Sequence, residues 1–189
     1  MSILNKQTGS VTLIASLVLG LVVFMMLFAI DLAHYYVVKT KLQVIVDNAT
    51  DAGAGYVGDK IVEYAKPRME AFENPPSSDP LFYLNDSERQ LLVYGETTYE
   101  IKQIMLIAEQ KNTQDISFAR EINFTSQVPA KKISLSCVGV NSVKFPIKST
   151  ASTDINIIFK PLAVILRKNT LNVNAESVTT ISLCPKNQS

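Results

Sequence analysis

The residues from Val11 to Ile30 include no charged side chain and no proline. As a helix, this run of about 20 residues would reach across the roughly 30 Å hydrocarbon core of a bilayer. Most of its side chains are Leu, Ile, Val or Phe, and their transfer into lipid is favourable by about 4–8 kcal/mol in sum. The first charge after the run, Asp31, should reach headgroups and water at the membrane edge. The sequence therefore predicts a transmembrane helix at residues 10–30, after a leader at residues 1–9.

A cleaved signal peptide is the main alternative for this segment. Signal peptides have an apolar core of about 7–15 residues that is followed by a small-x-small cleavage site. The apolar run here is longer, and the nearest such triplet, Ala52-Gly53-Ala54, lies far downstream. A buried helix of a soluble protein is disfavoured, because such helices rarely lack larger polar side chains over this length. We therefore favour a retained membrane anchor.

The helical pattern continues beyond the apolar run as a stalk at residues 31–73. Apolar residues recur at spacings near three and four, as on one face of a helix, at Leu32, Tyr35, Tyr36, Leu42, Ile45, Val46 and Ala49. The pattern resumes after three glycines and lasts until Pro67, which predicts a rod of about 87 Å from about residue 8 to 65. Glycines cost a helix up to about 1 kcal/mol each relative to alanine, so we expect a bend or a close helix contact at Gly53, Gly55 and Gly58.

The remainder of the chain reads as a linker at residues 74–86 and a head at residues 87–189. The linker is rich in Pro, Ser and Asn, which are typical of loops. A helix is expected from about Ser87 to Lys111, with Asn85 or Asp86 as its cap. Gly95 is a candidate interruption of that helix.

Alternating apolar and polar residues predict strands in the second half of the head. The clearest case is Leu171 to Glu176, and shorter pieces occur around residues 116–118, 122–124, 133–140, 143–145 and 155–157. Phe159 to Arg167 fits a crossover or a short helix. We therefore predict an α+β fold in which a long N-terminal transmembrane helix continues as a stalk and is followed by a small domain with a helix and an antiparallel sheet that has one wet face.

The two cysteines, Cys137 and Cys184, both lie on the C-terminal side of the anchor. A disulfide that closes a loop of this size would stabilise the fold by roughly 3–5 kcal/mol, but only in an oxidising compartment. Two unrelated buried thiols are the alternative. No C-x-x-C motif is present, so the cysteines give no support for a redox or zinc role.

The sequence offers little for catalysis or for binding nucleic acid. The formal net charge is +1, and the only histidine, His34, follows the anchor on the stalk. We expect no nucleic-acid partner, no cofactor, no metal and no enzymatic activity. Asp115-Ile116-Ser117 matches the start of a D-x-S-x-S metal motif, but Ala119 stands where the third oxygen ligand should be, so we favour a helix end followed by a strand.

Residues 9–54 resemble the N-terminal region of TadE/TadG-like proteins, minor pilin or pseudopilin components of tight-adherence (Flp-type) pilus systems. The resemblance lies in Gly9-Ser-Val-Thr-Leu-Ile-Ala-Ser-Leu17, in the segment from Phe28 to Gln43 and in Val46-Asp-Asn-Ala-Thr-Asp-Ala-Gly-Ala54. Matching positions include an acidic residue at the outer end of the span, a Tyr-Val-x-Lys segment, a Leu-Gln pair and an alanine-rich run, here at Asp31, Tyr36, Val37, Lys39, Leu42, Gln43, Asp47, Asp51, Ala52, Gly53 and Ala54.

This resemblance implies a single-pass protein of the bacterial inner membrane, with its N-terminus in the cytoplasm and a pilin-like C-terminal domain in the periplasm or outside the cell. It also implies a structural role in pilus assembly, adhesion and biofilm formation. The expected partners are the lipid bilayer, other pilin or pseudopilin subunits and inner-membrane pilus assembly proteins. The lysines flanking the span do not select an orientation by themselves.

Two further expectations concern processing and packing. The bond between Gly9 and Ser10 is the candidate site of leader cleavage, although Ile14 stands where processed pilins usually carry an acidic residue. Lateral assembly would bury the helix face that bears Tyr35, Leu42 and Ile45. For the tyrosines at positions 35, 36, 56 and 64, contacts with neighbouring subunits, an aromatic belt at the membrane and packing on the chain's own domain all remain open.

Two other functions fit the same architecture. One is a pseudopilin of a type II secretion or type IV pilus system, which differs in its partners. The other is a single-pass membrane-anchored binding module or enzyme, which would need a cluster of ionisable residues that the sequence does not show.

Overall fold

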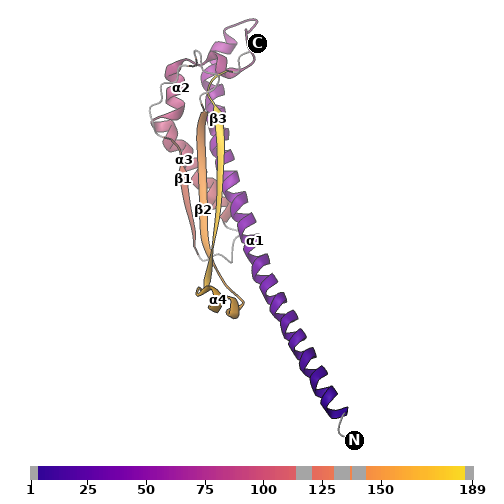
Figure 1. Cartoon of the computed structure of the whole chain (residues 1–189). Coiled ribbons are helices and arrows are strands. Elements are labelled where there is room, and N and C mark those ends of the chain that lie inside the picture. Colours follow the sequence, from indigo (N-terminus) through magenta and orange to yellow (C-terminus); the bar gives the residue numbers. More distant parts are fainter. Residues whose placement is uncertain (1–3, 114–120, 130–136, 138–143, 186–189) are drawn as a thin grey trace.

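The structure, a computed structural model, describes residues 4–113, 121–129, 137 and 144–185. The elements follow in the order α1 (Leu4–Glu70), the 3₁₀ helix η1 (Pro80–Tyr83), α2 (Asp86–Val93), α3 (Glu96–Thr113), β1 (Ile122–Gln127), β2 (Lys144–Asn156), α4 (Lys160–Leu166) and β3 (Thr170–Ser182). In Figure 1 the N-terminal part of α1 projects alone, and the other elements gather beside its C-terminal half. This is the α+β fold that the sequence predicts: a long apolar N-terminal helix packed against a domain with helices and a three-stranded antiparallel sheet.

The sheet has the strand order β1-β2-β3, and both pairings are antiparallel. Alternate residues of β2 are buried, and Ala151 of β2 lies opposite Phe124 of β1 and Ala175 of β3. The other face is polar, with an ion pair of 2.7 Å between Lys148 and Glu176. One face of the sheet is therefore buried and the other wet, as its alternating sequence predicts.

The buried face of the sheet packs on α1 and α3. α1 contributes a stripe of buried residues at helical spacing, which comprises Val38, Leu42, Ile45, Val46, Ala49, Thr50, Gly53, Val57, Ile61 and Ala65. Its first part packs against Ala151, Ile155 and Val173 of the sheet. Its second part joins a core with Ile101 and Met105 of α3. The stalk helix is thus a wall of the hydrophobic core.

A close contact between α1 and α3 occurs at Gly53. A Cβ atom at this position would lie 3.1 Å from Cγ of Met105 and 3.3 Å from Cγ2 of Ile101. The absence of a side chain at Gly53 therefore lets α3 approach the backbone of α1 closely. This confirms the expected helix contact at the glycines for Gly53, whereas Gly55 and Gly58 face open space.

α1 does not end before Pro67 as predicted but continues to Glu70. Pro67 removes one helical hydrogen bond, to the carbonyl of Glu63. Both residues are exposed, so water can satisfy that carbonyl. The next residue, Arg68, donates hydrogen bonds to the Tyr83 carbonyl and to Glu88, which holds the last turn in place.

The expected helix after the linker is divided into α2 and α3. Gly95 lies between them with φ of 84°, a left-handed conformation that glycine adopts without strain. Asn85 caps α2 as predicted: its side chain accepts the Glu88 N–H, and the Glu88 side chain accepts the Asn85 N–H. The segment from Phe159 to Arg167 contains the short helix α4. The expected strand pieces at residues 116–118 and 133–140 lie outside the described residues except for Cys137.

A disulfide joins Cys137 to Cys184, with 5.6 Å between their Cα atoms and a sequence separation of 47. The prediction of a bridge is confirmed. Cys184 follows the end of β3, so the bridge ties Cys137 to that end of the sheet. Loop closure of this size restricts the unfolded chain by about 4 kcal/mol in the chain-entropy treatment.

Replacing Gly53 with leucine is expected to destabilise the protein by about 1–3 kcal/mol, because the side chain would overlap Met105 and Ile101. Gly55→Leu is the matched control, since a Cβ atom there meets no heavy atom within 4 Å. Leucine should stabilise that exposed position by up to about 1 kcal/mol through helix propensity. Thermal unfolding in detergent micelles compares the variants, and equal melting temperatures would contradict the close contact.

Candidate membrane anchor and its junction with the head

The N-terminal part of α1 is apolar on all sides and is covered by little of the chain. Val11 and Ile30, at the ends of the run, are 65% and 50% exposed. Among the described residues, α1 is the one helix long and apolar enough to cross a membrane. A helix that is apolar all round belongs in a core or in lipid, and here no core surrounds it. The finding suggests one membrane span or a signal sequence.

Asp31 is buried at the point where this apolar run meets the head, with 4% of its surface exposed. Its two carboxylate oxygens accept the backbone N–H groups of Ile158 and Phe159, each at 2.9 Å. The expectation that Asp31 reaches headgroups and water is therefore wrong. The physical reason is its helical phase: Asp31 precedes Val38 by about two turns and shares the covered face of α1.

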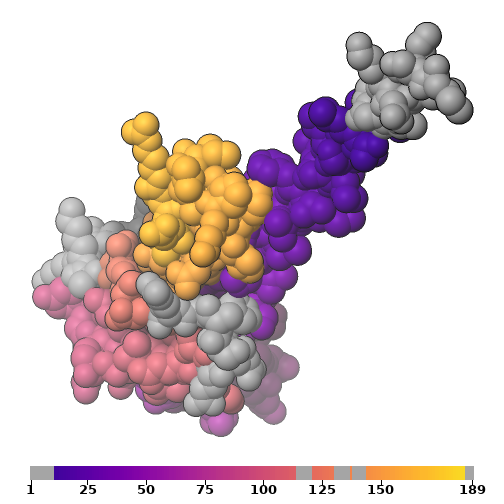
Figure 2. Space-filling view, turned by 90° about the horizontal axis from the view of Figure 1, so that it is seen from below, coloured from indigo at the N-terminus to yellow at the C-terminus, as the bar shows by residue number. Residues whose placement is uncertain are grey.

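The connection between β2 and β3, residues 157–169, packs beside the anchor. The rings of Phe159 and Phe24 meet edge to face, with centroids 4.9 Å apart. A groove of about 300 Å³ between α1 and α4 is lined by Phe28, Asp31, Leu32, Tyr35, Leu162, Leu166 and Leu171. Figure 2 looks at this end of the molecule and shows the gold atoms of the connection beside the purple helix. The anchor and the head are thus joined by side-chain contacts in addition to the continuous helix.

The three residues predicted for helix packing lie on the covered face of α1. Leu42 and Ile45 are buried, and Tyr35 is partly buried against the same cluster as Leu42. Leu42 and Tyr35 belong to the cluster that α1 forms with the sheet, and Ile45 is buried within the same chain. Packing of these side chains against a second subunit stays a prediction, and it would require the sheet to move away from α1.

The four stalk tyrosines have different surroundings. Tyr56 and Tyr64 pack on the main core, which is packing on the chain's own domain. The hydroxyl of Tyr56 donates a hydrogen bond to Glu100 of α3, and this bond raises the pKa of Tyr56 above its ordinary value. Tyr36 is 58% exposed and contacts Tyr35 edge to face. Tyr36 therefore remains available to lipid headgroups or to a partner.

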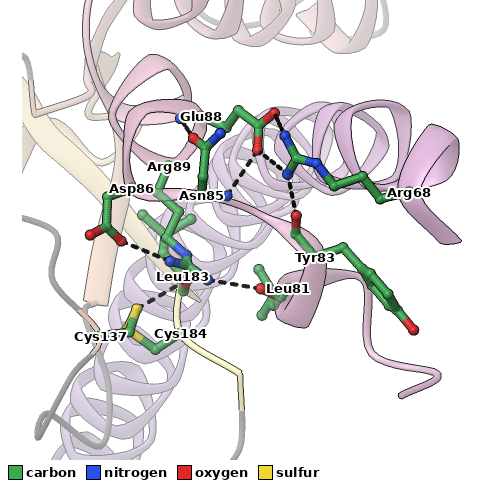
Figure 3. A network of polar contacts seen from close by, with 10 residues as sticks. All are labelled: Arg68, Leu81, Tyr83, Asn85, Asp86, Glu88, Arg89, Cys137, Leu183 and Cys184. Atoms are coloured by element: carbon green, nitrogen blue, oxygen red, sulfur yellow. Dashed lines mark hydrogen bonds and ion pairs between the residues drawn. A yellow bond between two sulfur atoms is a disulfide. The ribbon is translucent and has the colours of Figure 1, made fainter. Parts of the chain in front are cut away.

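A polar network fixes the far end of α1 to α2 (Figure 3). The guanidinium of Arg68 forms a two-pronged ion pair with Glu88, with N···O distances of 2.6 and 2.8 Å, and also donates to the Tyr83 carbonyl. Because Glu88 accepts the backbone N–H of Asn85 as well, one carboxylate serves both the ion pair and the helix cap. The hydrogen bond from Arg68, together with that from Asn85, lowers the pKa of Glu88.

Sequence reasoning missed a second buried carboxylate, Glu109 on α3. It is 1% exposed, and its Oε1 accepts hydrogen bonds from Ser126 and Ser149 of the sheet at 2.9 and 2.8 Å. Its position one turn after Met105 on the apolar face of the predicted helix was the available signal.

Within the described ranges, no group of three or more His, Cys, Asp or Glu residues is arranged to hold a metal. The motif at residues 115–119 lies outside those ranges.

Two other predicted positions lie on α1. Gly9 and Ser10 are within the helix, so the candidate cleavage bond is part of its first turns. His34 follows Asp31 by three residues on the same helix and belongs to no metal-binding group of His, Cys, Asp and Glu side chains among the described residues. Leader cleavage between Gly9 and Ser10 stays a prediction.

Asp31→Ala should loosen the β2–β3 connection, because two backbone N–H groups would lose their acceptor at a cost of about 1–3 kcal/mol. The expected result is faster hydrogen exchange at the amides of Ile158 and Phe159. Asp51→Ala, at an exposed position of the same helix, is the control and should leave these amides unchanged. Unchanged protection in the Asp31 variant would show that the carboxylate does not hold the connection.

The Arg68–Glu88 contact should make stability depend on pH with a defined sign. Because the pKa of Glu88 is lowered by folding from its ordinary 4.5, the stabilisation is fully present above that pH and is lost as pH falls through the folded-state pKa. The Tm of Glu88→Gln should therefore be below that of the natural chain at neutral pH, and the gap should narrow on acidification. Glu70→Gln, which breaks an exposed pair of 3.7 Å, is the control. A gap that is constant with pH would contradict the assignment.

A comparison with protein families adds to this geometry. The family model for Flp pilus-assembly TadE/G-like proteins matches residues 9–55. No curated protein and no solved structure matches the chain. The matched segment contains the apolar run, Asp31 and the part of the buried stripe of α1 from Val38 to Gly53. Residues 9–55 are therefore similar to the Flp pilus-assembly TadE/G-like family.

Proposed function

We propose that this protein is a membrane-anchored structural subunit, a minor pilin or pseudopilin, that acts in the assembly of a Flp/Tad-type pilus and thereby in adhesion and biofilm formation. In this proposal residues 11–30 span the bacterial inner membrane. The N-terminus lies in the cytoplasm, and the C-terminal domain lies in the periplasm or outside the cell.

One observation carries the proposal: the segment that matches the pilus-assembly family is the segment that carries the exposed apolar helix and its junction with the head. Because the anchor continues as a helix of the folded core, the bilayer can hold the subunit before assembly. The pilus assembly proteins can then move the anchor and the head together as one rigid unit. Lateral packing of such helices would replace lipid contacts with contacts between subunits. The bilayer, other pilin subunits and inner-membrane assembly proteins are accordingly the proposed partners.

The disulfide between Cys137 and Cys184 supports the proposed orientation, because disulfides persist outside the reducing cytosol. The contacts of the head with the apolar run favour a retained anchor over a cleaved signal. Removal of that run would take Phe24 from Phe159 and expose the apolar groove beside α4.

A surface for lateral packing is available outside the covered stripe. Val37, Val44 and Val62 are 50%, 52% and 49% exposed, and their spacing places them on one face of α1. This face continues from the anchor without interruption by the head. It is a better candidate for contacts between subunits than Leu42 or Ile45, which are already buried within the chain.

Alkaline phosphatase fused after Ser189 tests the orientation. An active fusion is expected, and an inactive fusion with the same protein expressed in full would reverse the proposed topology. The mass of the purified protein decides whether the bond between Gly9 and Ser10 is cleaved.

The pilus role requires a test in the source bacterium. Deletion of the gene should abolish assembled pili and surface adhesion, and the intact chain should restore both. The double variant Val18→Arg/Leu21→Arg should not restore them, because each arginine at mid-membrane costs about 2.5–3.5 kcal/mol. Ile107→Arg, on the exposed surface of α3, is the matched control and should restore pili. Normal pili after deletion would contradict the pilus role, and restoration by the double variant would contradict the anchor.

A further inference from the structure

The β2–β3 connection, residues 157–169, lies at the end of the sheet where the anchor leaves the head (Figures 1 and 2). Its contact with the anchor is direct, through Phe159 and Phe24. Phe24 precedes Asp31 by about two turns, so the contact lies about 10 Å along the helix into the apolar run. When that run spans a bilayer, the connection reaches the depth at which interfacial helices lie, about 5–10 Å into the boundary between headgroups and acyl chains.

The connection exposes apolar side chains at this level. Val164 and Ile165 are 77% and 68% exposed, more than any other large apolar side chain among the described residues. Ile158 and Leu166 are also exposed, and we call these four side chains the apolar tip. Single exposed apolar residues are ordinary on a protein surface, but a group of them beside a membrane span is typical of membrane contact.

The charged residues within the β2–β3 connection are all of one sign, and the nearest acidic residues of the sheet, Glu121 and Asp154, lie around a separate hollow beside Thr170. Lys160, Arg167 and Lys168 are exposed, and no Asp or Glu occurs between Asn156 and Thr170. Asp31, the acidic residue that faces the connection from α1, is buried with both oxygens occupied by backbone N–H groups. Apolar residues whose charged neighbours along the connection are all cations match a membrane surface that contains anionic lipid.

The backbone of the connection is also suited to this position. Asp31 accepts two of its N–H groups, and the N–H groups of Arg167 and Lys168 donate to the carbonyls of Val164 and Ala163 at the end of α4. Backbone groups without a partner are costly in hydrocarbon. Because these N–H groups are hydrogen-bonded within the chain, the free-energy cost of placing the non-helical backbone of the connection at the membrane is lower.

From these observations we infer that the β2–β3 connection is a second membrane-contact site. Its apolar tip inserts into the interface of the bilayer that the anchor spans, and Lys160, Arg167 and Lys168 bind anionic lipid headgroups. Together with the anchor, this contact sets the height and tilt of the head on the membrane. The inference rests on the proposed membrane anchor and is independent of the pilus role.

A single introduced tryptophan can test this, because the natural chain contains none. The full chain with Ile165→Trp is reconstituted in phosphatidylethanolamine–phosphatidylglycerol vesicles with bromine on the acyl chains. We expect emission at shorter wavelength than in water and loss of most of the fluorescence to bromine atoms near the headgroups. Ile107→Trp, on the exposed surface of α3, is the matched control and should not be quenched. Val18→Trp reports insertion of the anchor.

The results at positions 165 and 18 distinguish failure of the second membrane contact from failure of the membrane anchor. Quenching at position 18 without quenching at position 165 would overturn the second contact and leave the anchor intact. Absence of quenching at both positions would overturn the anchor as well. Emission at short wavelength from position 165 without quenching by bromolipid would show that protein, such as a second copy of the chain, covers the apolar tip, and it would overturn the inference.

A separate experiment tests the contact of Lys160 and Lys168 with anionic lipid headgroups. Adding Lys160→Glu and Lys168→Glu to the chain with Ile165→Trp should reduce quenching in vesicles with phosphatidylglycerol, and much less in vesicles of phosphatidylcholine alone. Lys102→Glu with Lys111→Glu, two exposed lysines of α3, is the control for net charge and should leave quenching unchanged. Equal quenching with and without the Lys160 and Lys168 substitutions would overturn the headgroup contact.

Discussion

The burial of one face of α1 beneath the sheet and α3 is the contact on which the rest of the structure depends. From Val38 to Ala65 this face supplies one side of the core, and together with α3 it covers the apolar side of the sheet. Before Asp31 the same helix is apolar on every side and packs on little of the chain. One continuous helix therefore contains a segment whose entire surface is apolar and suited to lipid, followed by a segment whose single apolar face is covered by the head. If the apolar run spans a membrane as proposed, rigidity of the helix across this change would fix the position of the head relative to the bilayer.

Asp31 stands where these two environments meet, and its chemistry suits the position. A carboxylate at the end of an apolar span is costly unless its oxygens are paired, and here the backbone N–H groups at the start of α4 provide the partners. The same bonds hold the β2–β3 connection against the anchor. The hydrogen bonds of Asp31 thus offset the cost of burying its charge and also hold the head in contact with the apolar run. At the far end, the pairing of Arg68 with Glu88 fixes the last turn of α1 to α2.

The sequence pattern was sufficient to predict those elements that are specified by residues close together in the chain. The apolar run, the amphipathic stripe, the Asn85 cap and the alternating strand β3 are each specified by neighbours a few residues away. The roles of Asp31 and Gly53 could not be predicted in detail, because their partners lie far along the chain: Ile158 follows Asp31 by 127 residues. The continuation of α1 past Pro67 depends likewise on contacts of Arg68 with η1 and α2. Periodicity places Leu42 and Ile45 on one apolar face of the helix, but it does not tell whether the same chain or another chain covers that face.

Nitroxide scanning along α1 tests the central claim most directly. Single labels from Leu13 to Val23 and from Val37 to Ala49 are attached through added cysteines, with the native disulfide intact, in dilute reconstituted vesicles. Accessibility to oxygen should be high at every position of the first segment with no helical period. In the second segment it should oscillate with a period near 3.6 residues and reach its minima at the stripe that contains Val38, Leu42 and Ile45. A protected face with that period between Leu13 and Val23, or free access of a water-soluble relaxation agent there, would contradict the account.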